Sequence, residues 1–342
     1  MPQSTLSPIQ FQQLLLDWQK QQGRHDLPWQ VNPTPYRVLV SEIMLQQTQV
    51  TTVIPYFLRW MERFPHIESL AVAAEDEVMS HWQGLGYYSR ARNLKKAAQY
   101  ILNECAGEFP TTLSELIKIP GVGRYTAGAI ASFAYDSYGP IVDGNVKRLF
   151  CRFFGIEGIP GTSKVDKALW QKAELYTPNQ NNRQFAQGLL DMGATICRPK
   201  TPKCDVCHFQ PHCLAYTEQR VLQLPTPKPK KTIPLKTGHF LWLQQDGKLL
   251  LEKRNESGIW GALWCLPQLN SEPLQIQERT TKQSVLEKGQ FKHTFTHYKL
   301  EAKVWTLDAV DSTPNPQQWF TAEQLTELGL PTPIKKFILK HL

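Results

Sequence analysis

The segment Ile119-Pro120-Gly121-Val122-Gly123 constrains the fold most, because it lies between two predicted helices and not after a strand. Residues 112–115 have the pattern of a helix N-cap, and the small side chains of 127–134 predict a second helix. The backbone N–H groups of Gly121 and Gly123 can approach an anion closely, and the second helix points the positive end of its dipole the same way. A nucleotide-binding fold would need a strand before the glycines. The pattern therefore predicts a helix–hairpin–helix that binds phosphate.

The charge of the chain favours a polyanionic partner, and nucleic acid before a membrane surface. The formal net charge is +8 at neutral pH. The length of 342 residues is typical of two or three domains. A merely basic soluble protein fits the charge equally well. Residues 1–10 are polar and contain two prolines, which argues against a signal peptide, and no apolar run approaches the ~20 residues of a membrane span. We therefore expect a cytoplasmic protein that binds no membrane, and we expect a monomer.

The sequence divides at residues 224–236, a stretch rich in proline and lysine that favours an extended linker. Residues 1–223 carry helical patterns, among them the apolar run 38–44. Residues 237–342 shift towards a hydrophobic period of two, which predicts a smaller α+β domain beside an all-α one. The strands are expected at 240–243, 248–251 and 291–305.

Four of the seven cysteines are clustered, with six, two and five residues between them: Cys197, Cys204, Cys207 and Cys213. Without a secretory signal, such a cluster favours a metal centre over disulfides. Zinc accepts four thiolates, but its usual pattern has two Cys-x-x-Cys pairs, and this loop has one. The spacing favours one [4Fe–4S] cluster, with zinc as the alternative. Three cations inside the loop could contact phosphates or could be incidental to a structural loop: Arg198, Lys200 and Lys203.

Two carboxylates are candidates for acid–base chemistry. Glu42 lies in the apolar run 38–45, where burial would raise its pKa and keep it protonated, as a general acid requires. The alternative is a glutamate on the solvent side of an amphipathic helix. Asp143 precedes the turn-forming pair Gly144-Asn145 and could cap a helix as well as act in catalysis. Two carboxyl groups in different environments can protonate a leaving group and stabilise a sugar cation.

These motifs occur together in one group of enzymes. The hairpin, the aspartate and the cysteine loop resemble the endonuclease III superfamily of DNA glycosylases, and the match is closest to its adenine-specific branch, the MutY family. The resemblance covers nearly the whole chain and rests on further matches at 41–50, 84–88 with Arg90 and Arg92, 143–148, 258–264 and 295–297. It implies an all-α barrel of six helices that contains the hairpin and an iron–sulfur subdomain at 197–213.

The resemblance implies a monofunctional enzyme of base excision repair in a bacterial cytoplasm. Such an enzyme flips out and excises adenine that is mispaired with 8-oxoguanine or guanine in double-stranded DNA. The resemblance also implies a role for each carboxyl group. Glu42 would be the acid that protonates adenine N7, and Asp143 would be the carboxylate that stabilises the sugar cation. Tyr125 and Asn145 are then expected to hydrogen-bond to Asp143 and keep it ionised, although Tyr125 could be only a packed aromatic. Tyr125 also stands where strand-cleaving relatives carry lysine, so the DNA strand should stay intact.

The resemblance also implies a set of DNA contacts. Three residues match the intercalating and stacking side chains of the family: Gln46, Gln47 and Tyr87. Phosphate contacts are expected from the hairpin glycines Gly121 and Gly123 and from Arg90, Lys147, Arg198 and Lys200. Lys147 could instead attack an abasic sugar, but a phosphate contact is its favoured role.

The C-terminal domain resembles a Nudix fold that has lost its hydrolytic residues. The Arg-Glu…Glu-Glu helix that would hold a metal ion is missing from the sequence, so the domain should bind without hydrolysing. By resemblance, Phe295, Thr296 and His297 form the loop that recognises 8-oxoguanine. Serine is usual at the central position, and Thr296 keeps the hydroxyl but adds a methyl group. The alternative is an ordinary strand with alternating aromatic residues.

Two other functions compete with this prediction. A bifunctional endonuclease III-type glycosylase and lyase for oxidised pyrimidines would need lysine in place of Tyr125 and would lack Glu42 and the C-terminal domain. A non-catalytic DNA-binding metalloprotein would not need Glu42 or Asp143.

Overall fold

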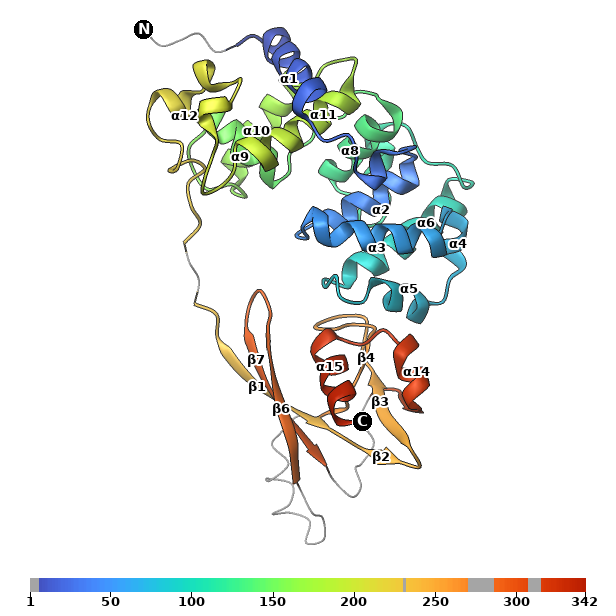
Figure 1. Cartoon of the computed structure of the whole chain (residues 1–342). Coiled ribbons are helices and arrows are strands. Elements are labelled where there is room, and N and C mark those ends of the chain that lie inside the picture. Colours follow the sequence, from blue (N-terminus) through green and yellow to red (C-terminus); the bar gives the residue numbers. More distant parts are fainter. Residues whose placement is uncertain (1–5, 230–231, 270–285, 307–314) are drawn as a thin grey trace. The chain divides into compact units, whose positions relative to one another are not determined.

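The computed structural model describes residues 6–229, 232–269, 286–306 and 315–342. The chain forms two compact units, Met1–Ala71 with Lys96–Pro229 and Val72–Lys95 with Lys230–Leu342 (Figure 1). We call them the helical unit and the sheet unit. The fold thus groups 72–95 with the C-terminal strands, whereas the sequence placed them in the helical region. The domain boundaries at 223 and 237 stay a prediction, and residues 230 and 231 of the linker lie outside the described residues.

The helical unit is built from short helices joined by tight turns. The α-helices that lie in it are α1 (Pro8–Gln22), α2 (Pro35–Leu45), α3 (Val50–Arg63), α4 (Ile67–Val72), α7 (Leu113–Leu116), α8 (Arg124–Tyr135), α9 (Gly144–Phe153), α10 (Ser163–Tyr176), α11 (Asn182–Asp191) and α12 (Leu214–Thr217). Shorter turns are η1 (Pro28–Gln30), the π-helix η2 (Met192–Ile196), η3 (Cys204–Val206) and η4 (Gln210–His212). Helix α6 (Ser89–Glu104) belongs partly to each unit, and the last residue of α4, Val72, falls in the sheet unit. Among the described residues, no helix is long and apolar enough to cross a bilayer.

An aromatic cluster fixes the cysteine loop to the helical core. The ring of Phe11, on α1, lies 5.1 Å from that of Phe153 on α9. It also lies 4.6 Å from the ring of Phe209, which is between Cys207 and Cys213 in the sequence. Phe11, Phe153 and Phe209 are almost completely buried. Because buried aromatic side chains dominate core energetics, this cluster ties the loop to α1 and α9.

The predicted helix–hairpin–helix is confirmed. Helix α7 starts after Thr112, whose side chain accepts a hydrogen bond from the Glu115 backbone, and α8 starts directly after Gly123. Gly121 adopts a φ of 79°, in the left-handed region that glycine enters without strain. The turn is closed by a hydrogen bond of 3.0 Å from Val122 N to Ile119 O.

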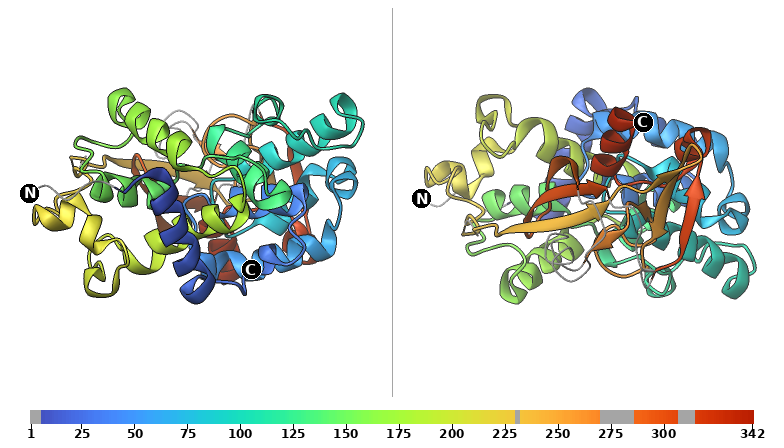
Figure 2. Two further views of the ribbon diagram at one scale, coloured as in Figure 1. Left: turned by 90° about the horizontal axis from the view of Figure 1, so that it is seen from above. Right: turned by 90° about the horizontal axis from the view of Figure 1, so that it is seen from below.

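The sheet unit contains two small sheets, which Figure 2 shows from below in its right-hand view. The first has the strand order β5 (Gln268–Leu269), β1 (Leu235–Leu241), β7 (Lys299–Thr306), β6 (Leu286–Thr294), and β1 and β7 are parallel. In the second, β3 (Lys248–Lys253) pairs with β2 (Gln244–Gln245), β4 (Trp264–Cys265) and β8 (Gln317–Phe320). The helices of the unit include α5 (Glu75–Trp82), α14 (Ala322–Glu327) and α15 (Thr332–His341).

The structure refines the strand predicted at 291–305. This run is a hairpin of β6 and β7, which is closed by a hydrogen bond of 2.9 Å from Phe295 N to Tyr298 O. Residues 295–297 therefore lie at the tip of a hairpin and not inside a continuous strand. A tip presents side chains to a partner more freely than a strand interior does.

Candidate active site and cysteine loop

Glu42 lies on α2 and is buried, with 4% of the residue exposed. Every residue of 38–44 is buried, because α8 and α3 both pack against α2. The Tyr125 hydroxyl donates a hydrogen bond of 2.5 Å to Glu42 Oε2. Burial raises the pKa of Glu42 to about 7, although the Tyr125 hydrogen bond lowers it, and the nearby charge of Asp143 raises it further. At neutral pH this carboxyl can therefore carry a proton to give away.

Tyr125, on α8, has a different partner from the one expected. The resemblance predicts a hydrogen bond to Asp143, but the Tyr125 hydroxyl donates to Glu42. Burial, followed by the charges of Glu42 and Asp143, raises the pKa of Tyr125 well above its usual value. The phenol therefore stays a neutral donor, and it holds the proton-bearing carboxyl in one orientation.

Asp143 caps α9. Its Oδ1 accepts a hydrogen bond of 2.7 Å from Val146 N, and its Oδ2 accepts one of 3.0 Å from Asn145 Nδ2, which is the contact expected for Asn145. Burial raises the pKa of Asp143, and these hydrogen bonds oppose the rise. The donors stabilise the ionised form, whereas Glu42 lies in a site that favours the neutral form. This is the division of roles that an acid and an anionic stabiliser need.

Arg148 connects the cysteine loop to this aspartate. Its Nε donates to Cys197 O at 2.7 Å, and its Nη2 donates to Asn145 Oδ1 at 2.9 Å and to Gly193 O at 2.7 Å. Gly193 lets the π-helix approach, since a Cβ there would stand 2.6 Å from the Cβ of Asn145. The amide of Asn145 is thus oriented from one side by Arg148 and presents its Nδ2 to Asp143.

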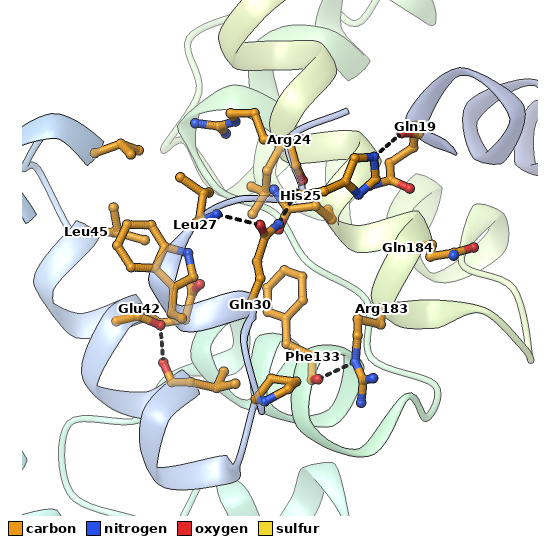
Figure 3. A pocket seen from close by; sticks show the side chains of 17 residues that line it. Gln19, Arg24, His25, Leu27, Gln30, Glu42, Leu45, Phe133, Arg183 and Gln184 are labelled. Carbon is orange, nitrogen blue, oxygen red and sulfur yellow. Dashed lines mark hydrogen bonds between the residues drawn. The ribbon is translucent and has the colours of Figure 1, made fainter. Parts of the chain in front are cut away.

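A cavity of about 240 Å³ opens beside Glu42 in the helical unit (Figure 3). Most of its lining was not predicted from the sequence. The lining includes Arg24, His25, Leu27, Gln30, Leu45, Phe133 and Gln187. Arg24 and Gln187 are both held by Asp191, a carboxylate with no exposed surface. No local pattern marks these residues, because they converge on the cavity from four separate segments.

Some of the predicted DNA contacts are exposed to solvent, whereas others contact groups of the protein itself. Gln46, Gln47 and Tyr87 are exposed, and so are Gly121 and Gly123 in the hairpin. Lys147 instead forms an ion pair of 2.9 Å with Asp166. Arg90 is buried and donates to the carbonyl groups of Leu85 and Gly86, so it supports the 84–88 loop where we expected a phosphate contact.

The four clustered cysteines line one cavity of about 30 Å³, which lies beside Arg152. Arg152 is buried and donates to the carbonyl groups of residues 197, 198, 199 and 224, and to Cys197 Sγ at 3.4 Å. Among the described residues, no group of three or more His, Cys, Asp or Glu side chains is arranged so that it could hold a metal ion. Arg198 donates to Thr201 O, and Lys200 is exposed.

The predicted recognition loop lies against a cavity of about 540 Å³ inside the sheet unit. Residues 84–89, 258–261 and 293–297 all contribute to its walls. Phe295 packs against Trp260, with ring centroids 5.4 Å apart. Thr296 and His297 are exposed, and the Thr296 hydroxyl lies 3.4 Å from His297 Nδ1. The loop thus offers one hydroxyl and one imidazole to a ligand.

Comparisons with known proteins agree with this architecture. Residues 40–175 match the HhH-GPD superfamily base excision DNA repair protein, and residues 238–340 match the NUDIX domain. The adenine DNA glycosylase of Buchnera aphidicola subsp. Schizaphis graminum is 39% identical and covers 96% of this chain and 97% of that protein. The adenine DNA glycosylase of Homo sapiens is 33% identical and covers 95% of this chain and 73% of that protein.

Solved structures resemble the helical part. A thermostable thymine-DNA glycosylase is 30% identical, with a TM-score of 0.57, and covers 62% of this chain and 97% of that one. An endonuclease III solved in a non-covalent DNA complex is 22% identical, with a TM-score of 0.53, and covers 63% of this chain and 98% of that one. At 22% identity, the second likeness supports the fold alone.

Proposed function

This chain belongs to the family of adenine DNA glycosylases, enzymes of base excision repair, and we propose that it removes adenine mispaired with 8-oxoguanine or guanine in double-stranded DNA. The observation that carries the proposal is Glu42, a buried carboxyl with a pKa of about 7 beside the cavity. An enzyme that expels a neutral base needs such a proton donor. We propose a monomer that acts in the cytoplasm of a bacterium.

The chemistry follows from the two carboxyl groups. As the bond between the sugar and adenine breaks, its electron pair moves to the base, and Glu42 supplies the proton that the leaving base requires. The sugar is left with positive charge, which the carboxylate of Asp143 stabilises until a water molecule adds to the anomeric carbon and loses a proton to solvent. Asn145 and the N-terminus of α9 keep Asp143 oriented throughout.

A panel of duplexes tests this proposal. We expect base release from adenine opposite 8-oxoguanine and from adenine opposite guanine, and none from thymine glycol. Release of thymine glycol would support a glycosylase for oxidised pyrimidines. Binding to all duplexes without release from any would support a non-catalytic DNA-binding protein.

The rate of adenine release should fall as pH rises through about 7, because Glu42 then loses its proton. The Tyr125 hydrogen bond lowers the pKa of Glu42, so Tyr125→Phe should move this falling limb to higher pH. Single-turnover rates on both sides of neutrality measure the shift. Tyr135→Phe is a matched control on the same helix, since its hydroxyl bonds to Phe109 O. An unshifted limb in Tyr125→Phe would contradict the assignment of Glu42 as the acid.

The enzyme should leave the DNA strand intact. Cleavage of the strand needs an amine that forms a Schiff base with the abasic sugar, but Tyr125 has none, and Lys147 Nζ is paired with Asp166 at 2.9 Å. We expect borohydride to trap little or no protein on product DNA, and Lys147→Ala to change nothing in that assay. Efficient trapping that disappears in Lys147→Ala would assign lyase activity to this lysine.

We propose that the cysteine loop holds one [4Fe–4S] cluster through Cys197, Cys204, Cys207 and Cys213. Support comes from the cavity that all four cysteines line and from their spacing along the chain. When bound, the cluster would join four thiolates and stiffen the loop. Purified protein should then contain about four iron and four sulfide per chain. One zinc and no sulfide would favour the alternative.

We further propose that the tip at 295–297 recognises 8-oxoguanine. Its support is the exposed hydroxyl of Thr296 beside a cavity lined by aromatic residues. Thr296→Val keeps the shape and removes the hydrogen bond. We expect this variant to bind guanine and 8-oxoguanine mispairs with more similar affinity than the parent does.

A further inference from the structure

A second groove lies beside the recognition cavity of the sheet unit, between β6 and α15. It has a volume of about 320 Å³, and residues 290–293 form one wall. Phe337 and His341 also line it, and their rings stack with centroids 4.1 Å apart. We call this feature the α15 groove.

The α15 groove is positively charged and carries no acidic lining. Lys336 and Lys340 are exposed on α15, one helical turn apart, and within the described part of the chain neither forms an ion pair. Lys292 on β6 forms an ion pair of 2.7 Å with Glu301, so it adds less positive charge to the groove. Burial lowers the pKa of His293, so this ring stays neutral and adds no charge. The ammonium groups of Lys336 and Lys340, which form no ion pair with another described residue, therefore dominate the charge of the groove.

The dipole of α15 does not account for both lysines. Lys340 lies in the last turn, where a cation is favourable, but Lys336 lies in the middle of the helix. Like charges four residues apart on a helix destabilise it. The pair is thus locally unfavourable, and an anionic partner would offset the repulsion.

The α15 groove is continuous with the recognition cavity, since His293, Thr332 and Pro333 line both. Neither lining contains an aspartate or glutamate among the described residues. Along the hairpin, Lys292 and Thr296 are on the order of 13 Å apart. About four nucleotides of one DNA strand span the same length along the helix axis. A strand with one base at the tip can therefore reach the groove with its backbone.

We propose that the α15 groove binds phosphates of the DNA strand whose damaged base contacts residues 295–297. Lys336 and Lys340 are the anchoring cations. This inference rests on the proposed function for the choice of strand. It assigns to the sheet unit a share of the affinity that does not depend on sequence, in addition to recognition of one base.

The salt dependence of DNA binding tests the groove. Each neutralised phosphate contributes about −0.9 to the slope of log K against log salt. The double variant Lys336→Gln/Lys340→Gln should therefore bind an adenine–8-oxoguanine duplex more weakly, with a slope less steep by about 1 to 2. The double variant Lys336→Arg/Lys340→Arg should keep the parental slope, because its charge is unchanged. Lys248→Gln, on an exposed position of β3, is the control for a lysine outside the groove.

A parental slope in the glutamine variant, with unchanged affinity, would overturn the proposal. So would an equal loss in Lys248→Gln. The proposed function is tested separately, by the preference of the parent for 8-oxoguanine mispairs over undamaged duplex. If that preference is absent but the slope still changes, the α15 groove binds DNA and the assignment of the recognition loop fails.

Discussion

Replacing Glu42 with glutamine should slow adenine release by about 10²- to 10⁴-fold, the usual contribution of a general acid. Glutamine has nearly the same shape, and its carbonyl oxygen can still accept the hydrogen bond that Tyr125 donates to Glu42. It has no proton to give to the leaving base. Single-turnover kinetics on an adenine–8-oxoguanine duplex measure the loss, and the affinity for the same duplex should stay near that of the parent.

The stability of the protein separates lost chemistry from lost fold in Glu42→Gln. The pKa of Glu42 is raised from 4.5 to about 7 on folding, so the folded state binds the proton more tightly than the unfolded state. Stability contributed by this group is therefore present below pH ~4.5 and is lost as pH rises through about 7. Glutamine does not ionise, so the variant lacks this loss of stability at high pH. Its melting temperature at alkaline pH should therefore be no lower than that of the parent. Glu174→Gln, an exposed partner of Arg124, is the matched control. Near-normal release by Glu42→Gln would reject the acid assignment.

Local features of the fold could be predicted from the sequence because each depends on a few neighbouring residues. Thr112 caps α7 and Gly121 makes the turn whatever the rest of the chain does. The recognition of Asp143 as a helix cap succeeded for the same reason, since its partner is Val146, three residues away.

The environment of Glu42 could not be predicted from periodicity alone. The residues at 38–40 and 43–45 are all apolar, so the pattern does not say which face of the helix is buried. Burial comes from α8 and α3, which pack on α2 from separate parts of the chain. Only the resemblance to a known family selected the buried alternative before the structure did.

Contacts between residues far apart in the chain also could not be predicted from the sequence. Tyr125 could reach either carboxyl, and its choice of Glu42 depends on how α8 packs against α2. Lys147 finds Asp166 on another helix, and Arg148 finds Cys197 across 49 positions. Such contacts are set by helix packing, so a cation in a motif could equally contact a phosphate or a carbonyl group.

Replacing Asp143 with asparagine should slow adenine release by at least about 10²- to 10³-fold, because one preorganised electrostatic stabiliser is lost. Asparagine caps helices as well as aspartate does, so α9 should keep its start at Gly144. What disappears is the negative charge beside the sugar cation. Single-turnover rates and mismatch affinity again separate chemistry from binding.

The expected loss in Asp143→Asn can be assigned to that charge by two comparisons. Asp136→Asn makes the same change at the C-cap of α8, where asparagine also tolerates a left-handed backbone, and it should release adenine normally. In the double variant with Glu42→Gln, the two losses should not simply multiply, because both groups act on the breaking of one bond. If Asp143→Asn released adenine at the parental rate, the sugar cation would have to be stabilised by other groups, and the division of roles between the two carboxyl groups would be wrong.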